Sequence, residues 1–546
     1  MWMHTLSRTM TADHPGRAQA PVGLLSRPGQ RRWSWVTGML GLALIVCLGT
    51  VARAADLASD IDRLISASEL GSSRVAYSVV DIDSGTTLAS RNDRLQMLPA
   101  SNMKLLTSGA ALLVLGQDFA FETTLHLSAD GKTLFVTGSG DPALADPDLL
   151  QEMGLDVEDF INRWVSDVAA HPSADTIRTV LVDGRVFEAK RVHPSWELDD
   201  LDKAYGAEVC GFNFYRNILQ VYAQPARQVG LAPEVFVMPD VTRIIPFRNN
   251  AQTADAGGAP APAGVWISRT RGENEFTLYG HVKTPQRAEI TVSNPGNLMA
   301  QVLADRLKRH GLTIESARLA TAQDPKPEDG TTVIGTIVRT PLPTVLRRCN
   351  TDSENLYAEA LLKRIGYAVT GQPGSWVNGG AIVRLVVSKK LGPALSTDVT
   401  ISDGSGLSRD NRVTARLLSA WLREMYREES IRDVYVDSMA QAGETGTLSN
   451  RFRTVELDGR VAAKSGYLSG VSCLSGYVIE PNGTAASFSI LVNNIPATGK
   501  NAISISTVKR FHERLVDLID KQLSAEDRLA EVDESSVEQP TGRLGG

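Results

Sequence analysis

The stretch GRVAAKSGYLSGVSCLSGYVIEPNGTAASFSILVNNI, residues 459–495, contains three short apolar runs separated by turn residues. Pro481, Asn482 and Gly483 separate the last two runs, and a tight turn between two such runs predicts a β-hairpin. Apolar residues of the next segment recur at helical spacing: Val508, Phe511, Leu515, Leu518 and Ile519. The C-terminal part therefore predicts three strands followed by a helix that packs on them.

The N-terminal part predicts strands of the same sheet. The segment RVAYSVVDIDSGTTLAS, residues 74–90, alternates in hydrophobicity on either side of a turn at Asp83-Ser84-Gly85. Alternation around such a turn is typical of a hairpin. We therefore expect strands from both ends of the chain to share one antiparallel sheet.

Helical patterns lie between these ends. They occur in KLLTSGAALLVLG, ENLYAEALLKRIG, GGAIVRLVVSKKLG and TARLLSAWLREMYRE. The sheet and the helices together predict an α+β fold, in which residues 55–120 and 340–524 form one discontinuous domain.

Residues 121–339 are then an insertion, whose runs of β-forming residues predict two nested β-rich domains. Within it, the Gly/Ala/Pro stretch 249–264 is expected to be disordered, and 320–332 is expected to be a linker. The acidic tail 525–546 is also predicted to be disordered.

The first 54 residues predict a cleavable export signal. Basic residues end at Arg31-Arg32, an apolar run extends from Val36 to about Val51, and Ala52-Arg53-Ala54 offers a small-x-small cleavage site. A membrane anchor is the alternative, but the run is shorter than the roughly 20 residues that a spanning helix needs. We therefore expect a signal peptide at 1–54 and a mature protein in the periplasm.

Composition limits the partners. The 546 residues are 42% hydrophobic and 22% charged, with a formal net charge of -6, and no Lys/Arg tract could follow a nucleic-acid backbone. We expect no nucleic-acid partner and no cofactor. The absence of a C-x-x-C pair argues against zinc, and metal catalysis lacks ligands at sensible spacing. Signal cleavage would leave Cys210, Cys349 and Cys473, and the sequence leaves open whether two of them pair.

Ser101 and Lys104 form an S-x-x-K motif at the start of a predicted helix. Residues i and i+3 share a helix face, so the amine can reach the hydroxyl. A serine needs a base to act as a nucleophile at pH 7, and a lysine serves only when burial or another cation lowers its pKa. The alternative is that Ser101 only caps the helix. The motif alone is weak, because Ser506 and Lys509 match it too, a match that we interpret as coincidence.

Two further motifs follow along the chain. Ser353 and Asn355 belong to an S-x-N, in which the serine can relay a proton and the asparagine can orient the lysine or a substrate carbonyl. Lys464, Ser465 and Gly466 form a K-S-G, in which the lysine and hydroxyl can hold a carboxylate while the glycine admits a close backbone approach. Taken singly, the S-x-N could be only a helix cap, and an ordinary edge-strand lysine before a turn would be the preferred explanation of the K-S-G.

The three motifs together are specific, because they occur in a fixed order around one predicted domain. The chain resembles the serine penicillin-binding proteins and β-lactamases, whose signature is S-x-x-K, S-D-N and K-T-G. More closely, it resembles the D-alanyl-D-alanine carboxypeptidase/endopeptidase family, the class C low-molecular-mass penicillin-binding proteins. The blocks that carry this resemblance are PASNMKLLT, GSGDPAL, LVDGRVF, SENLYAEALL, DGSGLSRDN, AGETGTLSNRF and KSGYLSGVSCLSGYV.

The resemblance extends from about residue 73 to about residue 520, and it implies a transpeptidase-like domain that carries large inserted domains. Three positions depart from the family pattern. Glu354 stands where aspartate is common, Ser465 replaces the usual threonine, and Ser469 stands where some members have glutamine. None of these changes removes a reacting group.

The resemblance also implies an acyl transfer. Ser101 attacks the carbonyl between two D-alanines, Lys104 is the favoured base, and Ser353 with Lys464 returns a proton to the leaving amine. Asn355 belongs to the same catalytic set. Which lysine is the true base stays open.

For substrate binding, the resemblance implies an oxyanion hole from the backbone N–H groups of Ser101 and Tyr467. Ser465, Gly466 and Lys464 would hold the terminal carboxylate. Asp183 and Arg409 would recognise the peptidoglycan side chain, although a turn aspartate and a surface arginine explain them as well. The implied partners are peptidoglycan stem peptides, with β-lactams as covalent inhibitors.

Other functions fit the sequence less well, because most of their motifs are missing. A class A β-lactamase uses E-x-x-L-N, and the chain contains no Leu-Asn pair. A class C β-lactamase uses Y-x-N, which Tyr215-Arg216-Asn217 matches, but that segment alternates like a strand, so Tyr215 is interpreted as structural. A Ser-His-Asp hydrolase lacks G-x-S-x-G. A catalytically inert wall-binding protein is disfavoured by the intact motifs.

Overall fold

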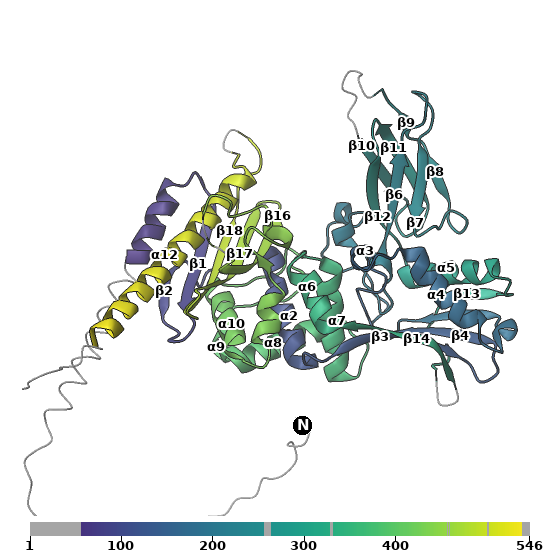
Figure 1. The fold of residues 1–546 in the computed structure, drawn as a ribbon, viewed down its shortest axis with the longest axis horizontal. Coiled ribbons are helices and arrows are strands. Elements are labelled where there is room, and N and C mark those ends of the chain that lie inside the picture. The colour runs from purple at the N-terminus through teal and green to yellow at the C-terminus, as the bar shows by residue number, and fades with distance from the viewer. Residues whose placement is uncertain are drawn as a thin grey trace, which may run out of the picture. The chain divides into compact units, whose positions relative to one another are not determined.

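This computed structural model describes residues 56–255, 264–327, 331–455, 457, 459–499 and 502–537, with side chains up to residue 525. These residues belong to one compact unit that begins at Arg53, and Figure 1 shows its elements. The predicted signal peptide at 1–54 lies outside the described residues.

A six-stranded sheet joins the two ends of the chain, in the order β15-β16-β17-β18-β1-β2. Its strands are β1 (Arg74–Asp81), β2 (Thr87–Arg91), β15 (Ala440–Gln441), β16 (Val461–Leu468), β17 (Val471–Ile479) and β18 (Ala485–Asn493). Strand β1 pairs antiparallel with β18, with Val79 opposite Phe488. The prediction of one antiparallel sheet built from both ends is therefore confirmed.

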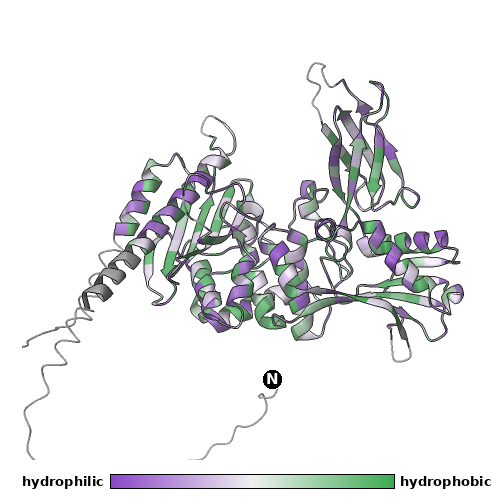
Figure 2. Cartoon of the chain, in the orientation of Figure 1, coloured by the Kyte–Doolittle hydropathy of each residue, from purple (hydrophilic) through white to green (hydrophobic). Residues whose placement is uncertain are grey.

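Both faces of this sheet are covered, because successive side chains of a strand point to opposite faces. On β17, Cys473 and Tyr477 pack into the core of the helical cluster, whereas Leu474 and Val478 pack into a second core with α12 (Ile505–Val537). Strands β17 and β18 are buried along almost their whole length, and Figure 2 shows them as predominantly hydrophobic. The predicted packing of the last helix on the sheet is confirmed.

The helical cluster lies on the face opposite α12 and carries the predicted helices. Its members are α2 (Met103–Leu115), α6 (Leu342–Asn350), α7 (Asn355–Thr370), α8 (Trp376–Leu391), α9 (Pro393–Ser396), α10 (Ala415–Arg427) and α11 (Arg432–Asp437). Residues 56–67 form a further helix, which packs with α12 through Leu57 and Ile61. Within the described residues, none of the helices combines the length and the apolar character that crossing a membrane requires.

The predicted insertion contains three sheets and a core of its own. A five-stranded sheet has the order β13 (Ser316–Leu319), β5 (Thr179–Asp183), β4 (Thr133–Gly138), β3 (Ala120–Leu127) and β14 (Thr332–Pro341). A three-stranded sheet has the order β12 (Gln286–Thr291), β6 (Ile218–Gln224) and β7 (Glu234–Met238). A four-stranded sheet contains β8 (Phe247–Asn249), β9 (Gln252–Thr253), β10 (Gly264–Arg269) and β11 (Phe276–Val282). Its helices are α3 (Pro147–Glu152), α4 (Val157–Ala169) and α5 (Pro295–Arg309).

Strands β3 and β14 connect this part to the helical cluster. They pair antiparallel, with Ala120 opposite Pro341, so the outgoing and returning chain run side by side. The boundaries at 121 and 339 stay a prediction, and they fall within this strand pair.

Two segments are more ordered than the sequence predicts. Helix α12 continues to Val537, although disorder was expected from residue 525, because its continuation SAEDRLAEV consists largely of helix formers. In the stretch 249–264, residues up to 255 are described, and Thr253 pairs with Val282 of β11. Backbone pairing with an existing strand thus orders part of a segment whose own side chains bury little surface.

Candidate active site

Ser101 lies in a short 3-10 helix, η1 (Ala100–Asn102), that leads into α2. The preceding Ala100 has a left-handed φ of 44°. A Cβ on Gly406 would lie 1.8 Å from the Ala100 carbonyl oxygen, so only glycine allows this close approach. Neither η1 nor α2 has a side-chain cap at its N-terminus. The structure gives no support to the helix-cap interpretation of Ser101.

Lys104 is fully buried on the first turn of α2. Its Nζ donates hydrogen bonds to Asn355 Oδ1 at 2.6 Å and to the Ser405 carbonyl at 3.0 Å, and it lies 3.0 Å from Ser101 Oγ. A neutral amine has two hydrogens and one lone pair, so these two acceptors leave the lone pair for the Ser101 hydroxyl. Burial lowers the pKa of Lys104, and the charge of Glu359 opposes this shift only in part.

Ser353 and Asn355 lie at the turn between α6 and α7. The Nδ2 of Asn355 donates to the Tyr205 carbonyl at 2.9 Å, which fixes the amide with its oxygen toward Lys104. Ser353 has a left-handed φ of 68° and lines the same cleft as Ser101. The S-x-N motif therefore lies beside the S-x-x-K motif.

Lys464 is the second buried lysine of the site, on β16. Its Nζ donates to the Ser465 carbonyl at 2.9 Å. Burial, aided by the positive charge of Lys104, lowers the pKa of Lys464 well below its usual value. Both lysines of the three motifs are therefore held toward their neutral forms.

The edge of β16 forms one wall of the site. Ser465 Oγ donates to Thr447 Oγ1 at 2.8 Å. A Cβ on Gly466 would lie 3.0 Å from the backbone nitrogen of Ser101, so the glycine brings β16 against the start of α2. Tyr467 follows, and its side chain is 63% exposed.

These residues surround a cleft of about 840 Å³. The sequence-predicted residues that line it are Ser101, Ser353, Asn355, Arg409, Ser465, Gly466 and Tyr467. Lys104 and Lys464 are buried behind these residues. Lys104 contacts Ser101 and Asn355, and Lys464 contacts Ser465. The structure thus brings the three motifs together at one place.

Asp183 lies elsewhere, at the end of β5. It does not belong to the described lining of the cleft. Its Oδ1 accepts from Arg185 Nε at 2.9 Å, and its Oδ2 accepts from Arg185 Nη2 at 2.5 Å. This paired carboxylate gives no support to direct substrate contact.

Comparison with known proteins identifies the family. The model of the D-Ala-D-Ala carboxypeptidase 3 (S13) family matches residues 57–513. The chain belongs to this family. The D-alanyl-D-alanine carboxypeptidase of Actinomadura sp. (strain R39) is 31% identical over 502 residues, which are 87% of this chain and 88% of that protein. The D-alanyl-D-alanine carboxypeptidase DacB of Haemophilus influenzae is 24% identical over 433 residues, 77% of this chain and 85% of that one.

Solved structures show the same fold. Penicillin binding protein 4 (dacB) from Haemophilus influenzae matches with a TM-score of 0.68 at 22% identity, over 84% of this chain and 99% of that one. The same protein complexed with a novel β-lactam matches with a TM-score of 0.64 at 21% identity, over the same shares. The predicted family, the α+β penicillin-binding fold and the serine-peptidase class are therefore confirmed for this S13 chain.

Several residues of the S13 site were missed by sequence reasoning. The turn at Gly404 and Ser405 supplies the carbonyl that accepts from Lys104, and Glu359 of α7 accepts from both backbone N–H groups, at 3.0 Å and 2.7 Å. Gly404 and Ser405 lie in the block DGSGLSRDN and Glu359 lies in SENLYAEALL, so the family blocks contain these residues without indicating their contacts. Lys509, which belongs to the second S-x-x-K match, also lines the cleft.

Other expectations concern residues away from the cleft. Tyr215 is buried, and its hydroxyl donates to Gln220 Oε1 at 2.7 Å, as expected for a structural residue. Cys210, Cys349 and Cys473 are all buried and unpaired, which settles the pairing that the sequence left open.

Proposed function

We propose that this S13 protein cleaves peptidoglycan stem peptides through an acyl-enzyme on Ser101, as a D-Ala-D-Ala carboxypeptidase, a D,D-endopeptidase or both. The position of the Lys104 amine carries the proposal. It lies 3.0 Å from Ser101 Oγ, and its two other neighbours, Asn355 Oδ1 and the Ser405 carbonyl, can only accept hydrogen bonds. This arrangement suits a base that takes the serine proton.

In the first half of the reaction, Ser101 Oγ attacks the carbonyl carbon between two D-alanines, and its proton passes to Lys104. The carbonyl oxygen becomes an oxyanion, to which the backbone N–H groups of Ser101 and Tyr467 donate. The proton then reaches the leaving amine through Ser353 and Lys464, and the C–N bond breaks. In the second half, water attacks the ester, and a proton returns to Ser101 Oγ as the acid leaves.

The cleft wall suits an anionic peptide substrate. The Ser465 hydroxyl and the Lys464 amine would hold the terminal carboxylate. Arg409 lines the cleft, where its Nη2 donates to the Ser469 carbonyl at 2.9 Å, and it would read the substrate side chain. A role for Asp183 stays a prediction. A β-lactam would acylate Ser101 as a covalent inhibitor, and the penicillin binding protein 4 complex with a β-lactam supports this.

The test is the intact mass of the protein after incubation with a labelled penicillin. Wild type should gain one slowly hydrolysed adduct, and Ser101→Ala should gain none. Ser506→Ala, at the other S-x-x-K match, is the control and should keep the adduct. Rapid loss of the adduct would instead indicate a β-lactamase, and the absence of any adduct in wild type would indicate an inert wall-binding protein. Purified crosslinked muropeptides then separate endopeptidase from carboxypeptidase activity.

Export to the periplasm is part of the proposal. Peptidoglycan lies outside the cytoplasmic membrane, and residues 1–54 have the order of a signal peptide. N-terminal sequencing of the protein from a periplasmic extract should begin directly after Ala54. An N-terminus upstream of Val36 would contradict cleavage.

A further inference from the structure

The conformation of Ser353 needs support from its surroundings. Its φ of 68° lies in the left-handed region, which is costly for a residue that carries a Cβ. Such a conformation persists only where neighbouring groups fix it. The turn at Ser353 also begins α7, where Asn355 contacts the Lys104 amine. Whatever fixes this turn therefore also fixes two groups of the proposed reaction.

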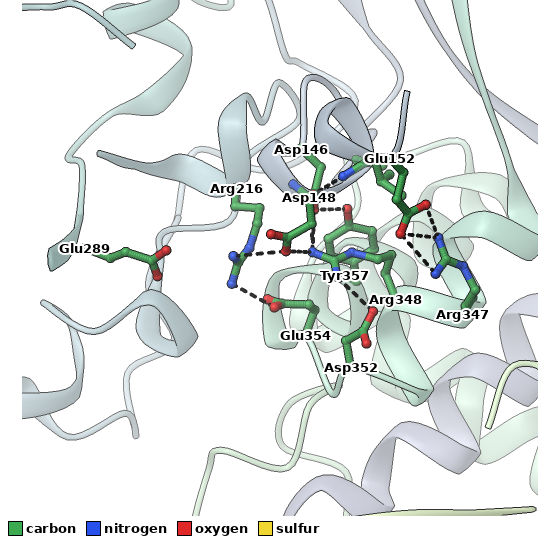
Figure 3. Close-up of polar contacts among 12 residues, drawn as sticks. Asp146, Asp148, Glu152, Arg216, Glu289, Arg347, Arg348, Asp352, Glu354 and Tyr357 are labelled. Carbon is green, nitrogen blue, oxygen red and sulfur yellow. Dashed lines mark hydrogen bonds and ion pairs between the residues drawn. The ribbon is translucent and has the colours of Figure 1, made fainter. Parts of the chain in front are cut away.

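The two chain neighbours of Ser353 are carboxylates, and each is bound by a different arginine. Arg348 Nη1 of α6 donates to Asp352 Oδ2 at 2.8 Å. Arg216 Nη2, from the predicted insertion, donates to Glu354 Oε1 at 2.7 Å. Figure 3 shows the two ion pairs side by side, with Asp352 below Arg348 and Glu354 below Arg216. The residues before and after Ser353 are thus both held by ion pairs.

Two aspartates at the start of α3 link the arginines. Arg348 Nη2 donates to Asp146 Oδ1 and Oδ2 at 3.1 Å and 3.0 Å and to Asp148 Oδ2 at 2.6 Å. Asp148 Oδ2 also lies 3.7 Å from Arg216 Nη1. In Figure 3, Asp148 lies between the two guanidinium groups. The side chains of Arg216 and Glu354 are only 12% and 16% exposed, so their attraction is screened little by water.

Arg216 is itself held in an unusual backbone. Tyr215, Arg216 and Asn217 have consecutive left-handed φ values of 52°, 55° and 56°. The Asn217 side chain stabilises this run, because its Oδ1 accepts from the Phe214 N–H at 2.9 Å and its Nδ2 donates to the Glu208 carbonyl at 2.8 Å. Left-handed residues normally occur singly. The Asn217 contacts thus stabilise the turn from which Arg216 reaches Glu354.

We propose that Arg216 is a positioning residue, which holds Ser353 and Asn355 in their reactive geometry by binding Glu354 from the inserted part of the chain. The inference rests on the proposed function. It assigns the inserted part a direct effect on acylation, although Arg216 does not belong to the described lining of the cleft. It also gives a reason for glutamate in place of aspartate in the S-x-N motif, since the longer side chain reaches the guanidinium.

The test compares Arg216→Ala with a matched control, Arg347→Ala. Arg347 neighbours Arg348 on α6 and pairs with Glu152 of α3, but that pair is 42% and 56% exposed. The rate of penicillin acylation at saturation should fall about 10- to 100-fold in Arg216→Ala, because misplaced reacting groups cost this much, with a smaller change in half-saturation. Arg347→Ala should acylate at the wild-type rate. Arg216→Lys should recover part of the loss, since it retains the charge.

A second measurement separates positioning from general destabilisation. In a double-mutant cycle, Glu354→Ala should add little to the acylation defect of Arg216→Ala, because both remove the contact between Arg216 and Glu354. Fully additive defects, or wild-type acylation by Arg216→Ala, would overturn the inference. If wild type itself forms no adduct, the proposed function fails, and the inference is tested by crystal structures of wild type and Arg216→Ala. Ser353 should lose its left-handed φ in the variant, and a retained left-handed φ would overturn the inference.

Discussion

At the scale of single residues, the site depends on two lysines that folding keeps from water. Lys104 and Lys464 are fully buried, and their amines contact oxygens of uncharged groups. Burial without a contacting carboxylate disfavours the ammonium form of both. Both lysines therefore favour the neutral amine, and a neutral amine can accept a proton.

This predicts how acylation depends on pH. The pKa of Lys104 is lowered from 10.5, so the neutral base forms as pH rises through a value below 10.5. We expect the rate of penicillin acylation of wild type to rise with pH and level off before pH 10.5, whereas Lys104→Met should lose about 100-fold or more at all pH values. Stopped-flow or mass-spectrometric rates between pH 5 and pH 10 provide the measurement. A rate that falls with rising pH would contradict Lys104 as the base.

Gly466 gives a second prediction at this scale. A Cβ there would lie 3.0 Å from the Ser101 nitrogen and from the Pro99 carbonyl, so the strand or the nucleophile must shift by a few tenths of an ångström. Gly466→Ala should reduce acylation at least about 10-fold, because the proposed oxyanion donors would move apart. Gly264→Ala, where a Cβ would meet open space, is the control. Equal acylation rates of the two variants would show that the approach of β16 is not critical.

At the scale of elements, the site is a junction of α2, α7, β16 and the turn at Gly404 and Ser405. Glu359 of α7 ties that turn down, because its carboxyl group accepts from the Gly404 and Ser405 N–H groups and from Trp376 Nε1 at 2.8 Å. The turn in turn offers the Ser405 carbonyl to Lys104. Glu359 therefore holds the turn that contacts Lys104, without contacting Lys104 itself.

The burial of Glu359 makes this junction sensitive to pH. Burial, aided by the nearby Asp403, raises the pKa of Glu359 from 4.5 to about 7. A raised folded pKa gives a contribution to stability that is complete below pH 4.5 and is lost as pH rises through about 7. We therefore compare the unfolding free energies of wild type and Glu359→Gln. Between pH 4.5 and pH 8, wild type should lose up to about 3 kcal/mol of stability relative to the variant. Urea denaturation of both proteins at several pH values measures this difference, and parallel pH profiles would contradict it.

At the scale of the whole molecule, the chain is held without crosslinks among its described residues. Cys210 lies in a loop, Cys349 in α6 and Cys473 in β17. All three are buried, and burial raises the pKa of each thiol, to about 11 for Cys210 and about 12 for the others. A buried thiol with a raised pKa is a poor nucleophile. Because none of the three forms a disulfide, the native protein should tolerate reductant.

A thiol titration tests this arrangement together with processing of the N-terminus. None of the three thiols should react with an aromatic disulfide reagent in the native protein, and all three should react after denaturation. A chain that retains Cys47 should show a fourth reactive thiol in denaturant. The melting temperature should not change on addition of dithiothreitol. A denatured protein with one reactive thiol would contradict the unpaired state.

Sequence reasoning succeeded where the signal is local or where a motif has a strict order. The hairpin at 74–90 and the strands of 459–495 were predictable, because alternation and turn residues act over a few positions. The three motifs were predictable as a set. It failed for Ser405 and Glu359, because nothing in their spacing shows that the turn and α7 meet behind Lys104.

The amino-acid sequence by itself determined the main strands and helices around the three motifs, the order of the motifs and the family, since periodicity and short motifs depend on neighbouring residues. Only the tertiary structure decided that Lys104 and Lys464 are both buried, that the three cysteines stay apart, and that Arg216 reaches Glu354. The physical reason is that burial and pairing depend on which distant segments pack together. The same lysine is a solvated cation on a surface and a neutral base in a closed core.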